Sequence, residues 1–170
     1  FQGATSFNKD VSNWDVSAVT TMERMFMNAS KFNNGGQPIN WTTPVLEKTQ
    51  YMFSGATLFN QPITWSTIYV TDMSYMFQNA EAFDQNIGYW DVNNVVNMQG
   101  MFSGATSFNQ SINAWKTGNV LNMYNMFYNA SSFDQNIASW DVSKVENMEG
   151  MFAGALVFNN GGNNTININW

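Results

Sequence analysis

The 170-residue chain is acidic, with 6 Lys and Arg against 12 Asp and Glu, and it contains neither cysteine nor histidine. This composition excludes disulfides, thiolate metal sites and histidine-based catalysis, and it disfavours a nucleic-acid partner, which requires a clustered basic surface. No apolar run approaches the ~18 residues that cross a bilayer, so no membrane insertion is expected within this segment. We expect a non-catalytic protein without a cofactor.

An internal repeat of roughly 25 residues organises the whole chain. A phenylalanine, usually preceded by methionine, begins each of seven units near Phe1, Phe26, Phe53, Phe77, Phe102, Phe127 and Phe152. A second phenylalanine follows six residues later, so the fourteen phenylalanines all fall in two columns. The seven tryptophans form a third column: Trp14, Trp41, Trp65, Trp90, Trp115, Trp140 and Trp170. We therefore expect one repeat solenoid domain over residues 1–170.

The first predicted element of each unit is a short helix around the Met-Phe pair. In one unit Val95, Met98 and Met101 are three residues apart, a spacing typical of one helix face. Only glycine or asparagine stands two residues after the first phenylalanine, and these residues most readily adopt the left-handed angles that end helices. The pattern predicts a helix of about two turns that ends there.

An Asn or Asp column follows the second phenylalanine: Asn8, Asn33, Asn60, Asp84, Asn109, Asp134 and Asn159. Such side chains can hydrogen-bond from coil to coil and satisfy buried backbone groups, so we interpret the column as a structural ladder. The alternative is a calcium site at Asp84 and Asp134, because calcium prefers oxygen ligands. Only two of the seven positions carry Asp, and they are not in adjacent units, so the ladder is favoured.

The last predicted element is a short strand. An aliphatic residue, for example Ile87, leads to tryptophan, and a β-branched residue such as Val92 stands two positions after Trp90. This alternation is typical of strands. The sequence thus predicts an α/β fold: a leucine-rich-repeat-like solenoid with one short parallel β-strand and one short helical turn per ~25-residue repeat.

Two sequence segments support a family resemblance. Residues 101–110 (Met-Phe-Ser-Gly-Ala-Thr-Ser-Phe-Asn-Gln) and the segment from Ile137 to Met148 resemble the BspA-like surface-protein repeats, a divergent leucine-rich-repeat group. The resemblance covers the whole chain. It implies an extracellular or cell-surface location and a role in adhesion, and it implies no catalytic residues. Thr49 departs from the pattern, because methionine is usual at that position.

Candidate sites other than the ladder are few. The carboxylate pairs Asp84 with Asp91 and Asp134 with Asp141 recur two units apart, which favours a structural role over an active site. The column after tryptophan, which includes Asp15, Asp91 and Asp141, is expected to face outward, where a binding surface would lie. Five Asn-x-Ser/Thr sequons mark possible N-glycosylation at Asn28, Asn40, Asn109, Asn129 and Asn163.

Three hypotheses about partners remain open. The chain runs from Phe1 to Trp170 without a polar capping unit, which predicts either a piece of a longer array or copies stacked end to end in a filament. The sequence favours an adhesive or structural surface protein. The alternative is a receptor-like module that binds a carbohydrate or protein ligand.

Overall fold

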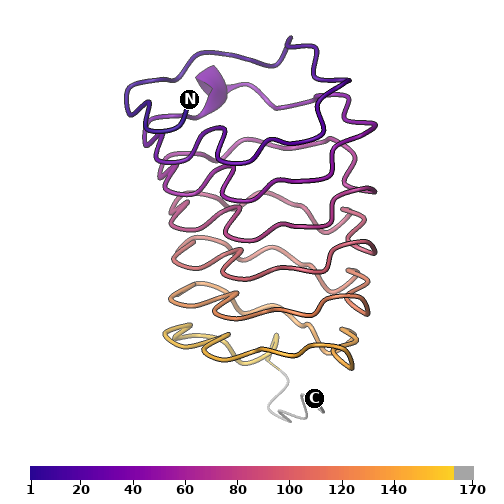
Figure 1. Cartoon of the computed structure of the whole chain (residues 1–170). Coiled ribbons are helices and arrows are strands. Elements are labelled where there is room, and N and C mark those ends of the chain that lie inside the picture. Colours follow the sequence, from indigo (N-terminus) through magenta and orange to yellow (C-terminus); the bar gives the residue numbers. More distant parts are fainter. Residues whose placement is uncertain (163–170) are drawn as a thin grey trace.

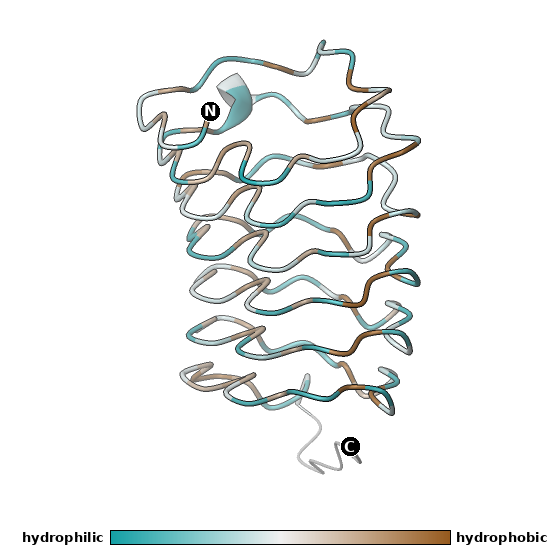
Figure 2. Cartoon of the chain, in the orientation of Figure 1, coloured by the Kyte–Doolittle hydropathy of each residue, from teal (hydrophilic) through white to brown (hydrophobic). Residues whose placement is uncertain are grey.

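The computed structural model describes residues 1–162, which wind into coils that lie one upon another in chain order (Figure 1). Hydrophobic and hydrophilic stretches recur at the same place in successive coils (Figure 2). The tryptophan-column position Trp170 and the sequon at Asn163 lie outside the described residues.

Regular secondary structure is almost absent from residues 1–162. The one helix there is the three-residue 3₁₀ helix η1, Asn34–Gly36. Parallel pairing is reduced to isolated bridges, one chain of which joins Thr21, Lys48, Asp72, Asn97, Asn122 and Asn147. The predicted α/β leucine-rich-repeat architecture, with a strand and a helical turn in each repeat, is therefore wrong.

The predicted helix is replaced by consecutive tight turns. Met101 N–H donates to the Met98 carbonyl of the same coil at 3.2 Å, as in a turn. Phe102 N–H instead donates to the Met126 carbonyl of the next coil at 2.9 Å. Gly100 and Gly104 have φ values of 57° and 70°. A helix requires negative φ throughout, so two left-handed residues four positions apart exclude it. The spacing of three residues reflects turns of type II geometry.

The predicted strand also consists of turns. Trp90 N–H donates to the Ile87 carbonyl at 3.0 Å, and Val95 N–H donates to Val92 at 2.9 Å. Each bond closes a four-residue turn, so the large apolar residues stand at corners of the coil, and their side chains point inward from successive corners. Alternation along the sequence therefore has a different cause from strand pleating.

The core is a double stack of phenylalanine rings. Within a coil the two rings lie face to face, with centroids 3.9 Å apart for Phe77 and Phe83. Between coils the same column continues at 5.7 Å from Phe77 to Phe102. Both columns are fully buried from Phe26 to Phe133. Because the two rings of one coil cover only the faces that they turn toward each other, stacking of neighbouring coils is what removes the remaining apolar surface from water.

Candidate functional site

The Asn/Asp column lies along one side of the stack, and each member holds the next coil. The side-chain oxygen of Asn60 accepts the backbone N–H of Asp84 at 2.9 Å, and Asp84 in turn accepts the N–H of Asn109 at 2.9 Å. Equivalent bonds join the remaining described members: Asn8 to Asn33, Asn33 to Asn60, Asn109 to Asp134, and Asp134 to Asn159. Every coil boundary in this column is bridged by an oxygen that satisfies a backbone donor.

A second column completes the ladder and was not anticipated from the sequence. A glutamine follows each inner ladder residue. Its Nε2 donates to the side-chain oxygen of the previous coil that already accepts the ladder residue's backbone N–H, at 2.8 Å for Gln85 to Asn60 and 2.9 Å for Gln110 to Asp84. Each oxygen thus accepts two hydrogen bonds from the next coil. The recurrence of Gln61, Gln85, Gln110 and Gln135 beside the ladder is the signal that could have revealed it.

One carboxylate oxygen of each calcium candidate accepts hydrogen bonds from the protein. Asp84 Oδ1 accepts from Asn109 and Gln110, and Asp134 Oδ1 accepts the N–H groups of Asn159 and Gly161 at 2.8 and 3.2 Å. Asn109 stands between the two Asp residues on the ladder. Within residues 1–162, no three acidic side chains form a group able to hold a metal ion.

The outward carboxylates close local turns. Asp91 Oδ1 accepts the N–H of Asn93 at 3.0 Å, and Asp141 Oδ1 accepts the N–H of Ser143 at 3.0 Å. Asp15 accepts both the hydroxyl and the N–H of Ser17, at 2.6 and 3.0 Å. The serine hydroxyl and then its N–H lower the pKa of Asp15 below its ordinary value, because both bonds favour the charged form. The structure therefore uses these carboxylates in turns.

The two members of each suggested catalytic pair have different hydrogen-bond partners. Asp84 bonds to the next coil and Asp91 bonds to its own turn, and no hydrogen bond in the described residues joins the two. The same division separates Asp134 from Asp141.

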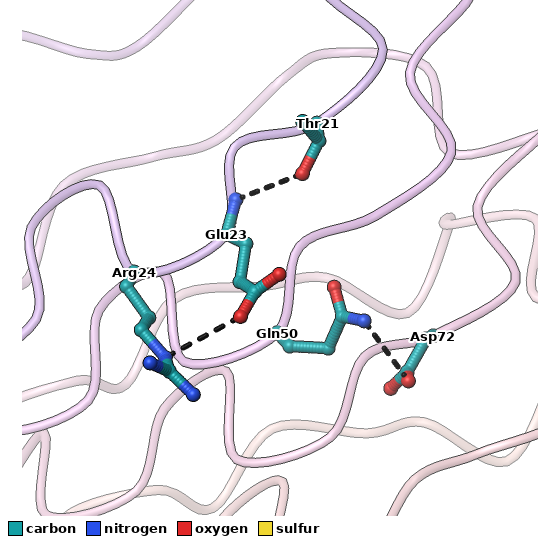
Figure 3. A network of polar contacts seen from close by, with 5 residues as sticks. All are labelled: Thr21, Glu23, Arg24, Gln50 and Asp72. Atoms are coloured by element: carbon teal, nitrogen blue, oxygen red, sulfur yellow. Dashed lines mark hydrogen bonds and ion pairs between the residues drawn. The ribbon is translucent and has the colours of Figure 1, made fainter.

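A polar network spans the first three coils beside the bridge column (Figure 3). Gln50 Nε2 donates to the Asp72 carboxylate at 3.1 Å, and the Arg24 guanidinium meets Glu23 at 3.3 Å. Arg24 also lies over the Tyr51 ring at 5.4 Å, and Tyr51 stacks on Tyr75 with centroids 4.6 Å apart. The aromatic faces in this column are thus covered by neighbouring coils.

The glycine/asparagine column alternates strictly and was not recognised as alternating from the sequence. From Gly3 to Gly154, glycine and asparagine take turns in successive coils, and all seven residues have positive φ. The reason is steric. A Cβ on Gly104 would stand 2.2 Å from Asn79 Oδ1, and one on Gly154 would stand 2.0 Å from Asn129 Oδ1. The amide of each asparagine therefore fills the space that a missing Cβ leaves in the next coil.

The described sequon asparagines are all exposed, but they differ in their contacts. Asn28 and Asn129 belong to the alternating column, where their amides lie against glycine. Asn40 Oδ1 accepts the Thr64 hydroxyl at 2.7 Å. Asn109 Oδ1 accepts two bonds from the ladder, so a glycan there would disturb the joint between two coils.

Cavities are shallow hollows between coils. One of about 460 Å³ is lined by Asn113, Ala114, Trp115, Lys116 and Ser139. A second, of about 260 Å³, lies at the corresponding position of the first two coils beside Asp15 and Thr42. A third, of about 270 Å³, is lined by Pro44, Val45, Glu47 and Tyr69 on the following corner.

Comparison with known proteins identifies the family but no characterised relative. Residues 1–67 and 63–165 match the family described as "Mycoplasma protein of unknown function, DUF285". Neither a curated protein nor a solved structure matches the chain significantly. In the described residues, no helix has the length and apolar character needed to cross a membrane. Because the two matched segments cover most of its length, the chain belongs to the DUF285 family of Mycoplasma proteins.

Proposed function

We propose that the chain is a non-catalytic protein of the cell surface or the extracellular space, and that it acts in adhesion. One observation carries the proposal: the recurring residues hold coils together, whereas the outward residues differ from coil to coil. The position after tryptophan is exposed in every described coil and is occupied by Asp15, Thr42, Ser66, Asp91, Lys116 and Asp141. A rigid scaffold with variable exposed positions is the usual design of a binding surface.

The surface location is supported by the similarity to BspA-like repeats at residues 101–110 and 137–148. This similarity concerns the repeat phrases, and the leucine-rich-repeat architecture is not part of the proposal.

The non-catalytic role is supported by the contacts of the carboxylates. Asp84 and Asp134 accept hydrogen bonds from the next coil, and Asp15 and Asp141 close turns. A catalytic carboxylate must be free to exchange a proton with substrate or to attack it. These side chains are instead employed as acceptors at recurring positions.

A protein partner is favoured over a carbohydrate. Sugar sites commonly use an open aromatic face. The tyrosines that share a column, Tyr51 and Tyr75, stack on each other, and Arg24 covers the outer face of Tyr51. The exposed tyrosines, Tyr69, Tyr89 and Tyr128, stand at different positions of their units and so do not form a column. The exposed positions after tryptophan instead offer mixed charge and hydroxyl groups, which suit a protein surface.

The test compares the chain with a variant whose outward positions are neutralised. Asp15, Asp91 and Asp141 are changed to asparagine, whose side-chain oxygen can still accept the turn N–H, and Lys116 is changed to glutamine, while the ladder and the aromatic columns are kept. We expect the wild-type chain to bind host cells in flow cytometry and the variant to lose binding at an unchanged melting temperature. Equal binding by both proteins, or binding by neither, would contradict the proposal.

A further inference from the structure

One outward column forms a straight strip across five coils. We call it the corner strip: Glu47, Thr71, Val96, Leu121 and Glu146. Each member after Glu47 donates its backbone N–H to the carbonyl of the member before it, at 2.9 Å from Thr71 to Leu121 and 2.7 Å at Glu146, and the Glu47 N–H donates to Thr20 of the first coil at 2.8 Å. These bonds fix one side chain per coil at a constant spacing. The strip is therefore preorganised, and its binding involves little ordering of the backbone.

The middle of the corner strip is apolar and exposed. Val96 and Leu121 expose 41% and 39% of their surfaces although both lie beside the packed core. At the adjoining corner Val45, Ile68 and Tyr69 are exposed as well, and Val45 and Tyr69 line the 270 Å³ cavity together with Glu47. Isolated exposed apolar residues are ordinary, but exposed apolar residues that recur on four successive coils favour an interaction surface.

Both ends of the corner strip are acidic. Glu47 and Glu146 are exposed, and the one ion pair within residues 1–162 joins Arg24 to Glu23 instead. Lys48 follows Glu47 in the chain and belongs to the bridge column. Lys144, near Glu146, donates its Nζ to Asn119 Oδ1 at 2.7 Å. Two carboxylates thus flank the apolar middle without a cation bound to either.

We propose that the corner strip binds an extended protein segment that is apolar in the middle and carries Lys or Arg at both ends. The two Glu residues are four coil steps apart, about 19 Å if the coils have the spacing of paired strands, roughly 4.8 Å. An extended segment advances about 3.3 Å per residue, so its two cationic residues would be about six positions apart. This inference rests on the proposed binding function and adds the chemistry of the partner.

A second copy of the chain is a poorer occupant. Two corner strips placed side by side in register oppose Glu47 to Glu47, and the antiparallel arrangement opposes Glu47 to Glu146. Both arrangements bring like charges together, which disfavours association. A cationic segment meets the same two positions with opposite charge.

The experiment uses two labelled seven-residue peptides with alternating valine and threonine, one with lysine at both ends and one with glutamate at both ends. Fluorescence anisotropy is measured with the full chain over a range of NaCl concentrations. We expect binding of the lysine peptide only. Val96→Asp should abolish it, and Glu47→Gln and Glu146→Gln should each weaken it about threefold, the scale of an exposed ion pair. Each Gln variant should also reduce the salt dependence.

Leu58→Asp is the matched control, because Leu58 is 55% exposed but lies outside the corner strip. It should bind the lysine peptide as the wild type does. The inference is overturned if both peptides bind equally or if Val96→Asp retains binding. Cell binding by the Glu47→Gln, Glu146→Gln double variant at the wild-type level would also overturn it, although the adhesive function would stand. Failure of the wild-type chain to bind cells would reject the adhesive function alone.

Discussion

Asparagine recurs in three columns of the stack, besides other positions, and its amide acts differently in each column. In the ladder, Asn109 Oδ1 accepts bonds from the next coil. In the alternating column, Asn79 has a φ of 54° and fills the space beside Gly104. In the bridge column, Asn122 Oδ1 accepts the N–H of Tyr124 within its own turn at 3.0 Å. The asparagine content thus accompanies the near absence of strands and helices from residues 1–162, because side chains supply bonds that a backbone ladder would otherwise supply.

Asn109→Ala tests the ladder at one residue. The substitution leaves the Asp134 N–H and the Gln135 amide without their acceptor, so the free energy of unfolding should fall by about 1–3 kcal/mol. Asn109→Asp keeps an acceptor oxygen and should be near the wild type, since Asp84 and Asp134 occupy the same column. Urea denaturation measures both. Equal losses for the two variants would mean that the oxygen is not what matters.

The turn at Asp15 predicts a pH dependence. Its pKa is lowered in the folded chain, so its stabilising contribution is complete above the ordinary value of 3.8 and is lost as pH falls through the lowered pKa. Ser17→Ala removes the hydroxyl donor, and the pKa of Asp15 should rise toward the ordinary value. NMR titration of the side-chain carboxyl carbons follows this change. Asp141, in another coil, should titrate as before, and an unchanged Asp15 would contradict the turn.

At the scale of the single coil, the sequence identifies columns but not the backbone that carries them. Phenylalanine, tryptophan and Asn/Asp columns can be found because they recur at one period. One column of positive φ is also visible, since only glycine and asparagine stand two residues after the first phenylalanine. A second such column is not visible, because it holds Arg24, Tyr51 and Tyr75. The helix could not be distinguished from turns, because Val95, Met98 and Met101 have the same spacing in both. Pairings such as that of Asn79 with Gly104 require knowledge of which coils are neighbours.

The tryptophan column differs from coil to coil in one bond. Trp115 Nε1 donates to the Ile87 carbonyl at 3.1 Å, whereas Trp65 Nε1 has no partner among residues 1–162. The Ile39 carbonyl, at the corresponding place, accepts the Thr64 N–H instead. Both rings are 3% exposed, so their burial is matched.

Substitution of phenylalanine for these two tryptophans isolates that bond. Trp115→Phe loses ring volume and a hydrogen bond, and Trp65→Phe loses ring volume alone. The free energy of unfolding should therefore fall by about 1 kcal/mol more for Trp115→Phe, the size of one net hydrogen bond. Thermal and urea unfolding of both variants supply the comparison. A larger loss for Trp65→Phe would show that the indole N–H is not a stabilising donor in this column.

At the scale of the whole molecule, the stack has a period of two coils. The aromatic and ladder columns repeat in every coil, but glycine and asparagine alternate, so neighbouring coils are not interchangeable. Deletion of residues 102–126 would place Asn129 directly after Asn79, where glycine is required. Deletion of residues 77–126 would place Asn129 after Gly55 and preserve the alternation.

The melting temperatures of the two deletion variants should therefore not follow the number of coils that each variant retains. The shorter deletion should have the lower melting temperature, although it retains more core. Asn129→Gly should restore much of the loss in the shorter deletion, because it removes the crowded Cβ and amide. Differential scanning calorimetry of the three proteins gives the order. If the melting temperature instead falls with each coil that is removed, the alternation of glycine and asparagine does not contribute to stability.

The Phe102 backbone N–H donates to the next coil and not back to Met98, as it would in an α-helix. Scalar coupling across hydrogen bonds, measured by NMR on isotopically labelled chain, reports donor and acceptor directly. The structure predicts coupling from the Phe102 nitrogen to the Met126 carbonyl carbon, across a 2.9 Å bond. Coupling from Phe102 to the Met98 carbonyl carbon would instead indicate a helix and contradict the account.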